Sequence, residues 1–387
     1  MKILKSVGFR NVGVLEWVIT ICLLILSKPY FVWHSYVPTI ATVISVLVAL
    51  GFHEVPNGKK FYGFLCLCLF YLLAAIRHTS LGGTIVLCMI PLLLLISKKS
   101  FLNAFHNFVI FLAFLLVPSL IMYVLVTFFG VTIPSVEVQP INELKEYTYS
   151  QYPFLIIDNI ERGLIVTRFH ALFDEPGVIG SIAGLVLWVN GFNLKKWYNI
   201  VLFISGMFSF SLFFYLLTII YIVIYSKTKT KVSIILFLVI SIPILLQKVP
   251  DLESLLFNRF KIEDGVWVGN SRSASGFDLW YHSFKKTDAY LYGLGAGSNL
   301  IYNSGGASYR DIIVNYGLLS FLLYCLSWFL LSLSNLPIKY FFLSTLIIMM
   351  FIFQRPFIFD SFVLFLFLYS VYAPLEAVQL DQLLSKK

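Results

Sequence analysis

The stretch WYNIVLFISGMFSFSLFFYLLTIIYIVIYS, residues 197–226, decides how the chain is folded. Its 30 residues are more than the roughly 20 that one transmembrane helix needs, and fewer than two full spans need. Lysines flank it on both sides, at Lys195, Lys196, Lys227, Lys229 and Lys231. Basic residues in short loops favour the cytoplasm. We therefore expect two short helices that turn near 205–211 and leave all of these lysines on one side of a membrane.

Apolar runs of similar character recur along the whole sequence. Hydrophobic residues make up 59% of the chain and charged residues only 12%, about half the charged fraction of a typical soluble domain. The runs that are long enough to be spans lie near 13–30, 36–53, 60–78, 81–97, 104–130, 176–192, 197–226, 232–248, 308–334, 337–353 and 355–374. With 197–226 counted twice, they predict an all-α, polytopic membrane helical bundle of about twelve spans. We expect a single integral membrane domain over residues 1–387.

The charges agree with this topology. Both termini are then cytoplasmic, and most lysines outside the long polar segments fall in cytoplasmic loops. The net charge of +9 therefore reflects orientation and is poor evidence for nucleic-acid binding. Two polar segments, 131–175 and 249–307, interrupt the apolar rhythm and are both expected outside the cytoplasm. They hold many of the acidic residues, so we expect the functional site in these two outer loops.

The remaining residue types argue against several kinds of site. The five cysteines lie in apolar runs, without zinc-ligand spacing or a disulfide framework. The six histidines are scattered, and the sequence contains no HExxH motif and no Walker A loop. We therefore expect no metal ion and no nucleotide cofactor.

The first candidate segment is RFHALFDEPGVIG, residues 168–180. A proline after an acidic residue is typical of a helix start. One interpretation is structural: Asp174 or Glu175 caps the helix, and Arg168 anchors the chain at the membrane surface. The other interpretation is functional. Arg168, His170 and the two carboxylates would gather at a helix N-terminus, which favours anions, and would hold a phosphate beside a general base.

The second candidate segment combines Arg272, the aromatic pair Trp280 and Tyr281, and the glycine-rich run YGLGAG at 292–297. The glycine-rich run precedes no βαβ unit, so it does not indicate a dinucleotide site. Aromatic rings beside polar groups suit sugar rings. Alternatively, an amphipathic helix lies on the membrane with both rings at the headgroup level.

The third candidate is Arg310, which opens the apolar run 308–334 together with the motif NYGLLSF from Asn315. Arg310 is either part of a functional site or half of a local ion pair with Asp311 at the membrane edge. The sequence leaves both interpretations open.

Several of these motifs resemble a known family by their order along the chain. They are RFHALFDEPGVIG from Arg168, SGMFSFS from Ser205, NSR from Asn270, YGLGAGS from Tyr292 and NYGLLSF from Asn315. Over roughly residues 160–330 this order resembles the O-antigen polymerase and O-antigen ligase family of bacterial glycosyltransferases. The spans and large outer loops resemble the membrane glycosyltransferase type C superfamily.

The resemblance implies a substrate and a place in the cell. The substrate is an oligosaccharide repeat unit on undecaprenyl pyrophosphate, polymerised into O-antigen or capsule at the outer face of the bacterial cytoplasmic (inner) membrane. The energy lies in the sugar–pyrophosphate bond, so no nucleotide sugar, metal or cofactor is implied. Besides membrane lipid, a chain-length regulator protein is a partner that the resemblance allows.

The resemblance also suggests residue roles. Arg168 and Arg272 would hold the pyrophosphate, with Arg310 as a third cation, since a guanidinium offers forked donors and a permanent charge.

Glu175 is our first choice as general base, followed by His170 and Asp174. Trp280 and Tyr281 would contact the sugars.

Three alternatives remain open. The resemblance implies that a ligase of this family would carry a His-Asn pair shortly before the glycine that this chain has at Gly317. Residues 305–308 contain no histidine, and this favours the polymerase branch. The resemblance also implies a Ser-Arg pair after the small residues of the run 197–226, but here Phe210 follows Ser209. A lipid-linked sugar flippase would line its bundle with charges, whereas Glu16 and Asp360 are the chief ones in apolar runs. A sugar acyltransferase usually has a paired histidine arrangement, which this sequence lacks.

Overall fold

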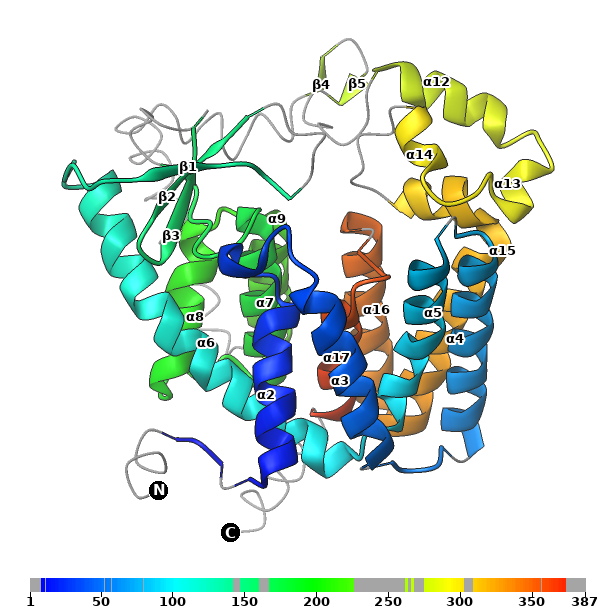
Figure 1. Cartoon of the computed structure of the whole chain (residues 1–387). Helices are drawn as coiled ribbons and strands as arrows, with labels where there is room; N and C mark the ends of the chain where they lie inside the picture. The colour runs from blue at the N-terminus through cyan, green and yellow to red at the C-terminus, as the bar shows by residue number, and fades with distance from the viewer. Residues whose placement is uncertain are drawn as a thin grey trace. The chain divides into compact units, whose positions relative to one another are not determined.

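The computed structural model describes residues 8–10, 12–51, 53–56, 58–78, 80–141, 147–159, 167–225, 262–263, 266–267, 275–302, 309–355 and 357–373. In this part the chain is mostly helical (Figure 1). It divides into two compact units. Unit 1 comprises residues 1–27, 35–108 and 271–387, and unit 2 comprises residues 28–34 and 109–270.

Unit 1 is a helical bundle in which α4 (Gly58–Ile76) packs along α15 (Tyr309–Asn335). The two helices are antiparallel, because Gly63 near the start of α4 lies against Ser327 and Leu331 near the end of α15. The other elements of this unit are α2 (Val14–Leu26), α3 (Val37–Gly51), α5 (Leu81–Met89), the 3-10 helix η2 (Ile90–Leu95), the first part of α6 (Lys98–Thr127), α12 (Ser275–Phe284), α13 (Ala289–Tyr292), α14 (Ser298–Ile301), α16 (Ile338–Gln354) and α17 (Ser361–Tyr372).

Three described helices, α4, α6 and α15, are long and apolar enough to cross a membrane. Shorter apolar helices fill the other predicted runs, apart from 232–248, which lies outside the described residues. The prediction of a helical membrane protein is thus confirmed at this level. The count of about twelve spans stays a prediction.

Two predicted runs do not form one straight helix. The run 81–97 forms α5 and then η2, because Pro91 lacks the N–H that a continuing α-helix requires. The run 355–374 becomes helical only at Ser361. There the Asp360 carboxylate accepts a hydrogen bond from the backbone N–H two residues later, at 2.9 Å, and caps α17.

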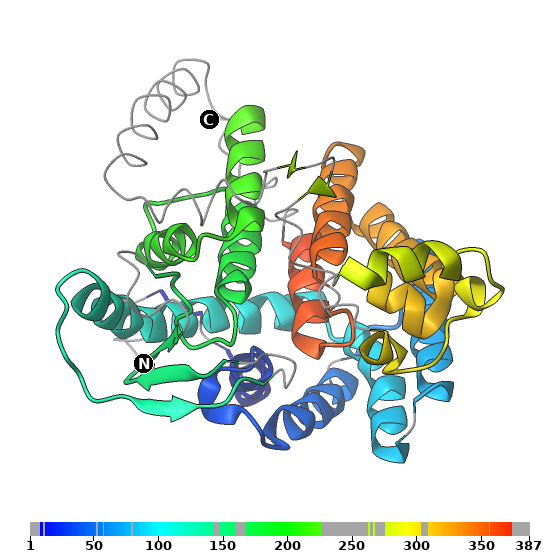
Figure 2. The same ribbon diagram turned by 90° about the horizontal axis from the view of Figure 1, so that it is seen from above.

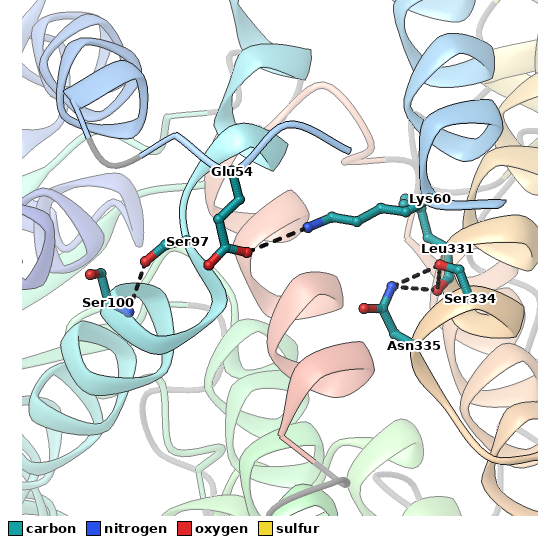
Figure 3. Close-up of polar contacts among 7 residues, drawn as sticks. All are labelled: Glu54, Lys60, Ser97, Ser100, Leu331, Ser334 and Asn335. Atoms are coloured by element: carbon teal, nitrogen blue, oxygen red, sulfur yellow. Dashed lines mark hydrogen bonds and ion pairs between the residues drawn. The ribbon is translucent and has the colours of Figure 1, made fainter. Parts of the chain in front are cut away.

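One end of unit 1 gathers lysines that the sequence assigns to the cytoplasm. The Lys60 Nζ lies 4.0 Å from the Glu54 carboxylate (Figure 3). The ammonium groups of Lys60 and Lys98 lie 5.4 and 5.8 Å from the centre of the Tyr372 ring. The starts of α4 and α6 and the end of α17 therefore meet at one end, as the lysine pattern requires. The side of the membrane on which this end lies stays a prediction.

Unit 2 combines helices with a three-stranded antiparallel sheet of order β1-β2-β3. Its elements are η1 (Tyr30–Val32), the second part of α6, β1 (Val136–Val138), β2 (Tyr149–Tyr152), β3 (Leu155–Asp158), α7 (Pro176–Val189), α8 (Trp197–Phe208), α9 (Leu212–Tyr225), β4 (Ile262–Glu263) and β5 (Val266–Trp267). Strands β4 and β5 form a separate antiparallel pair.

The three-stranded sheet lies in 131–175, where the sequence analysis predicted only a polar outer loop. Its strands β2 and β3 pair with Tyr152 opposite Leu155, so Pro153 and Phe154 form a two-residue turn. Phe154 has a φ of 62°. Proline followed by a positive φ is the pattern of a type II turn. All residues of β3 are buried, so its short apolar run was the overlooked strand signal.

Helix α8 runs antiparallel to α7. At its start, the Asn190 Nδ2 of the preceding turn donates a hydrogen bond to Asn199 Oδ1 at 3.1 Å. At its other end, the turn after α8 lies against the first part of α7. A Cβ added to Gly180 would overlap Ser209 and Ser211, so only glycine permits this approach.

Helix α9 returns alongside α7. Its last residue, Tyr225, lies with its ring 6.1 Å from the ring of Trp188, near the end of α7. The chain reverses at Phe210, which has a φ of 48°. The prediction of two short helices with a turn near 205–211 is therefore confirmed, and the start of α8 and the end of α9 share one end of unit 2.

Candidate functional site

The candidate site of unit 2 is Thr167–Glu175, a segment that we call the strap and that leads into α7. Backbone hydrogen bonds hold its middle. The Ala171 carbonyl accepts from the Ile156 N–H of β3 at 2.9 Å, and the Leu172 carbonyl accepts from the Tyr30 N–H at 2.8 Å. Ala171 takes a φ of 53°, so the strap bends sharply between these two contacts.

The beginning of the strap is held by two helices. The Tyr123 hydroxyl of α6 donates to the Thr167 carbonyl at 2.6 Å, and the Phe169 N–H donates to the Phe208 carbonyl at the end of α8 at 2.8 Å. Arg168 lies between these two anchored residues and is half-buried. Its backbone is therefore fixed on both sides while part of its side chain stays accessible.

His170 lies inside unit 2, with 1% of its surface exposed, and its ring meets Tyr149 edge-on with centroids 5.7 Å apart. The Tyr149 hydroxyl donates to the backbone carbonyl of Asp174 at 2.6 Å. Burial raises the pKa of the Tyr149 phenol far above its ordinary value, and the charge of Asp174 raises that pKa further. Tyr149 is therefore a protonated donor at neutral pH that links β2 to the strap.

Glu175 occupies the N-cap position of α7, with an extended backbone at φ −135° and ψ 139°, and Pro176 follows in the first turn. The predicted helix start is thus confirmed. Within the described helix, however, the Glu175 carboxylate accepts no capping hydrogen bond; its carbonyl oxygen accepts from the Val178 N–H at 3.0 Å. The interpretation of the Glu175 side chain as a helix cap therefore does not hold.

Arg168, His170, Asp174 and Glu175 all lie on the strap, which ends at the entry to α7. A helix N-terminus favours anions, and a guanidinium binds phosphate oxygens through paired donors. A half-buried carboxylate can accept a proton. The chemistry that this segment supports is departure of an anionic group beside a proton acceptor.

In unit 1, α12 places Tyr281 in the interior, beneath two cations. The Arg310 guanidinium and the Lys285 Nζ each lie 5.2 Å from the centre of the Tyr281 ring, in the range of cation–π contacts. Burial raises the pKa of the Tyr281 phenol well above its ordinary value, and the Arg310 charge offsets part of that rise. Tyr281 is buried within the protein, so its ring is not exposed as it would be on an amphipathic helix lying on the membrane. The level of α12 relative to the headgroups stays a prediction.

Trp280 belongs to a stack of aromatic rings. Its ring stacks on Tyr302 at 4.0 Å and on Phe284 at 5.0 Å, both at 13° between planes. Tyr302 is 38% exposed and is a more accessible ring than Trp280. The sequence analysis missed Tyr302, since the stack joins residues that are far apart in the chain.

A pair of glycines holds the loop after α13 against α15; we call Gly293 and Gly317 the glycine clasp. A Cβ at Gly293 would lie 2.5 Å from the Gly317 nitrogen, and a Cβ at Gly317 would overlap the Leu291 carbonyl. Gly317 also has a φ of 86° and a ψ of 162° inside α15. The Leu294 N–H donates to the Val314 carbonyl at 2.8 Å. The glycines of both motifs thus serve close backbone packing.

Side chains reinforce the glycine clasp. The Arg77 Nη1 donates to the Gly293 carbonyl at 3.0 Å. The Asn315 Nδ2 donates to Asn299 Oδ1 at 2.8 Å, and the Asn299 N–H donates to Asn315 Oδ1 at 2.9 Å. No sequence pattern marks Arg77 for this role, because its partner is a backbone carbonyl remote in sequence.

The predicted site residues therefore form two groups. They are Arg168, His170, Asp174 and Glu175 in unit 2, and Trp280, Tyr281 and Arg310 in unit 1. Arg272 lies outside the described residues. That both groups belong to one site stays a prediction. Comparison of the chain with protein-family models, curated proteins and solved structures found no match.

Proposed function

We propose that the chain is a membrane glycosyltransferase of polysaccharide synthesis. It would join repeat units carried on undecaprenyl pyrophosphate at the outer face of the bacterial cytoplasmic membrane, as an O-antigen or capsule polymerase. The observation that carries the proposal is the strap, which holds a guanidinium, an imidazole and two carboxylates in one anchored segment at the start of α7. The motif order along 160–330 supports it.

The proposed reaction forms a glycosidic bond. A hydroxyl oxygen of the acceptor sugar attacks the anomeric carbon of the donor as the bond from that carbon to the pyrophosphate oxygen breaks. The hydroxyl proton passes to a base on the protein, and the lipid pyrophosphate leaves with the bonding electrons. The protein must therefore supply a proton acceptor and positive charge for the leaving group.

Glu175 is the proposed proton acceptor, because its carboxylate is half-buried at the entry to α7, at the end of the anchored strap. His170 suits a positioning role, since its ring is buried against Tyr149. Asp174 is the second choice of base, because it is half-buried at the same end of α7.

Arg168 is the first proposed ligand of the pyrophosphate, and Arg272 and Arg310 are the further proposed ligands. The Arg310 guanidinium lies 5.2 Å from the centre of the Tyr281 ring, and this cation–π contact helps to hold it in place. Such preorganised cations stabilise the charge that develops on the leaving group.

The aromatic stack of Trp280 and Tyr302 is the proposed sugar contact. Tyr302 offers the more accessible ring, and the Trp280 ring stacks on it at 4.0 Å. Tyr281 acts through Arg310, since its own ring is buried.

Replacing Glu175 by Gln tests the proposal directly. Glu175→Gln keeps the size of the side chain but cannot accept the proton, so activity should fall about 10²-fold or more. The variant should still insert and fold, because Gln keeps the size of the side chain, and thermal unfolding checks this. The assay is polymer length from the purified chain and a lipid-linked repeat unit. Glu137→Gln, an exposed carboxylate in the same unit, is the matched control and should remain active.

Retained activity in Glu175→Gln would remove Glu175 as the base. The class of reaction is tested in cells that lack the chain. Lipopolysaccharide or capsule with single repeat units would support a polymerase. Lipid cores without any repeat units would instead indicate a ligase, and accumulation of unflipped carrier would indicate a flippase.

A further inference from the structure

Large apolar side chains are exposed in residues 291–302, which we call the apolar loop, although it lies outside the helices long enough to span a membrane. Tyr292, Leu294, Leu300 and Ile301 expose 56%, 41%, 51% and 77% of their surfaces. They lie on the short helices α13 and α14 and the turn between them. Side chains of this kind rarely gather on a water-facing surface without a partner.

Two hydrogen bonds hold the apolar loop beside the end of the spanning helix α4. Arg77 is the residue after α4; its guanidinium donates to the Gly293 carbonyl, and its own carbonyl accepts from the Ala296 N–H at 3.4 Å. The end of a spanning helix lies where acyl chains give way to headgroups. The apolar loop therefore lies at headgroup level, beside the end of α4 and the start of α15 (Figures 1 and 2).

The exposed surface of the spanning helices leads towards this loop. Ile76, the last residue of α4, is exposed, and so is Leu72 one turn earlier. Leu319 of α15, two residues after the glycine clasp, is exposed as well. Exposed apolar side chains on a spanning helix face lipid. The apolar loop continues this lipid-facing surface beyond the helix ends.

The charges next to the apolar loop match lipid headgroups. Lys285 and Lys286, directly after α12, are both exposed, and so is the acidic Asp288. Lysines near a membrane surface are attracted by anionic lipids, and tyrosines such as Tyr292 are enriched at the interface.

We propose that the apolar loop is a membrane-surface anchor. Its side chains lie among the acyl chains next to the headgroups, and Lys285 and Lys286 contact lipid phosphates. Through the glycine clasp, the anchor fixes the height of the first turns of α15, and with them Arg310, relative to the membrane. The inference does not depend on the proposed reaction, because it rests on exposure, hydrogen bonding and charge alone.

Photolabelling of the wild-type chain in lipid nanodiscs tests the anchor. One sample receives a carbene precursor dissolved in the bilayer, and a matched sample receives a water-soluble one. Peptides are then quantified by mass spectrometry. The ratio of lipid-borne to water-borne label should be several-fold higher for 291–302 than for the neighbouring exposed stretch 285–288. It should approach the ratio at Leu72 and Ile76. Equal ratios for the two stretches would overturn the proposal, as would protection of 291–302 from both reagents, which would mean that protein covers it.

The lysines are tested with the double variant Lys285→Gln, Lys286→Gln. Nanodiscs that contain phosphatidylglycerol should raise the lipid-borne label of 291–302 in the wild type, relative to nanodiscs of phosphatidylcholine alone. The attraction of one lysine to an anionic membrane surface is about 1 kcal/mol, which corresponds to roughly a fivefold change in how often the apolar loop is in contact with lipid. The variant should lose this response to anionic lipid. An equal response of both chains would overturn the role of the lysines.

Discussion

Replacing Gly317 by Ala should loosen the contact between α15 and the loop after α13. The added Cβ would overlap the Leu291 carbonyl oxygen and the Tyr292 carbonyl carbon, and it would lie 2.7 Å from the Gly293 nitrogen. All three contacts are backbone, so no side chain can rotate away. In addition, a φ of 86° with a ψ of 162° belongs to a region that is essentially restricted to glycine.

The expected loss follows from these two effects. Backbone strain of this kind amounts to about 1–3 kcal/mol, and an overpacked contact adds about 1–3 kcal/mol. The total of about 2–6 kcal/mol exceeds that of most point mutations. Gly82→Ala is the matched control, because it lies in α5 of the same unit with open space around its Cβ. It should stabilise the chain by about 0.5–1 kcal/mol.

Both variants are compared with the wild type by thermal unfolding in nanodiscs and by limited proteolysis. Because the chain can relieve the overlap by releasing the loop, cleavage within 289–302 should increase sharply in Gly317→Ala. A wild-type unfolding midpoint together with wild-type proteolysis in Gly317→Ala would refute the packing argument.

Further predictions concern the strap and the topology. Arg168→Ala should abolish most polymer formation while the protein still inserts, and Arg168→Lys should also be impaired, since one ammonium cannot reproduce a bidentate fork; near-normal chain length in both at matched expression would leave Arg168 as an anchor. Because burial raises the pKa of Tyr149, its contribution to stability is present below pH about 10 and is lost as the pH rises further. Above that pH, the free energy of unfolding of the wild type should fall more steeply than that of Tyr149→Phe, by up to about 1.4 kcal/mol per pH unit; parallel curves would contradict the raised pKa. Cysteines placed at Phe154 and Lys285, both exposed, should be labelled from outside the cytoplasm; labelling from the cytoplasm at either position would contradict the topology.

Much of the helical framework could be predicted because apolar runs dominate the sequence. A reversal near 205–211 was inferred from flanking lysines, and the helix start at Pro176 from its acidic neighbour. The sheet could not be predicted as easily. β1 is only three residues long, and β2 has no apolar alternation, so both depend on pairing partners.

The candidate site was predictable in its residue types but not in its supporting contacts. Tyr149 and Tyr123 hold the strap through backbone carbonyls, and no sequence pattern marks a carbonyl as an acceptor. The glycine clasp shows the same limit. Its two motifs were noted separately, but only the fold shows that Gly293 and Gly317 need each other.

The helices that meet the strap are short for a membrane. With 14 and 12 residues, α7 and α8 measure about 21 and 18 Å along their axes, against roughly 30 Å for the hydrocarbon core of a bilayer. A spanning helix that is shorter than the hydrocarbon core is accommodated by local thinning of the bilayer. Non-helical backbone within the hydrocarbon core must have its N–H and C=O groups hydrogen-bonded by the protein. The Phe169 N–H meets this need at the end of α8, where it donates to the Phe208 carbonyl. For α7 and α8 to cross a bilayer, the lipid beside them would have to be locally compressed, or the strap would have to lie below the headgroups of the unperturbed membrane.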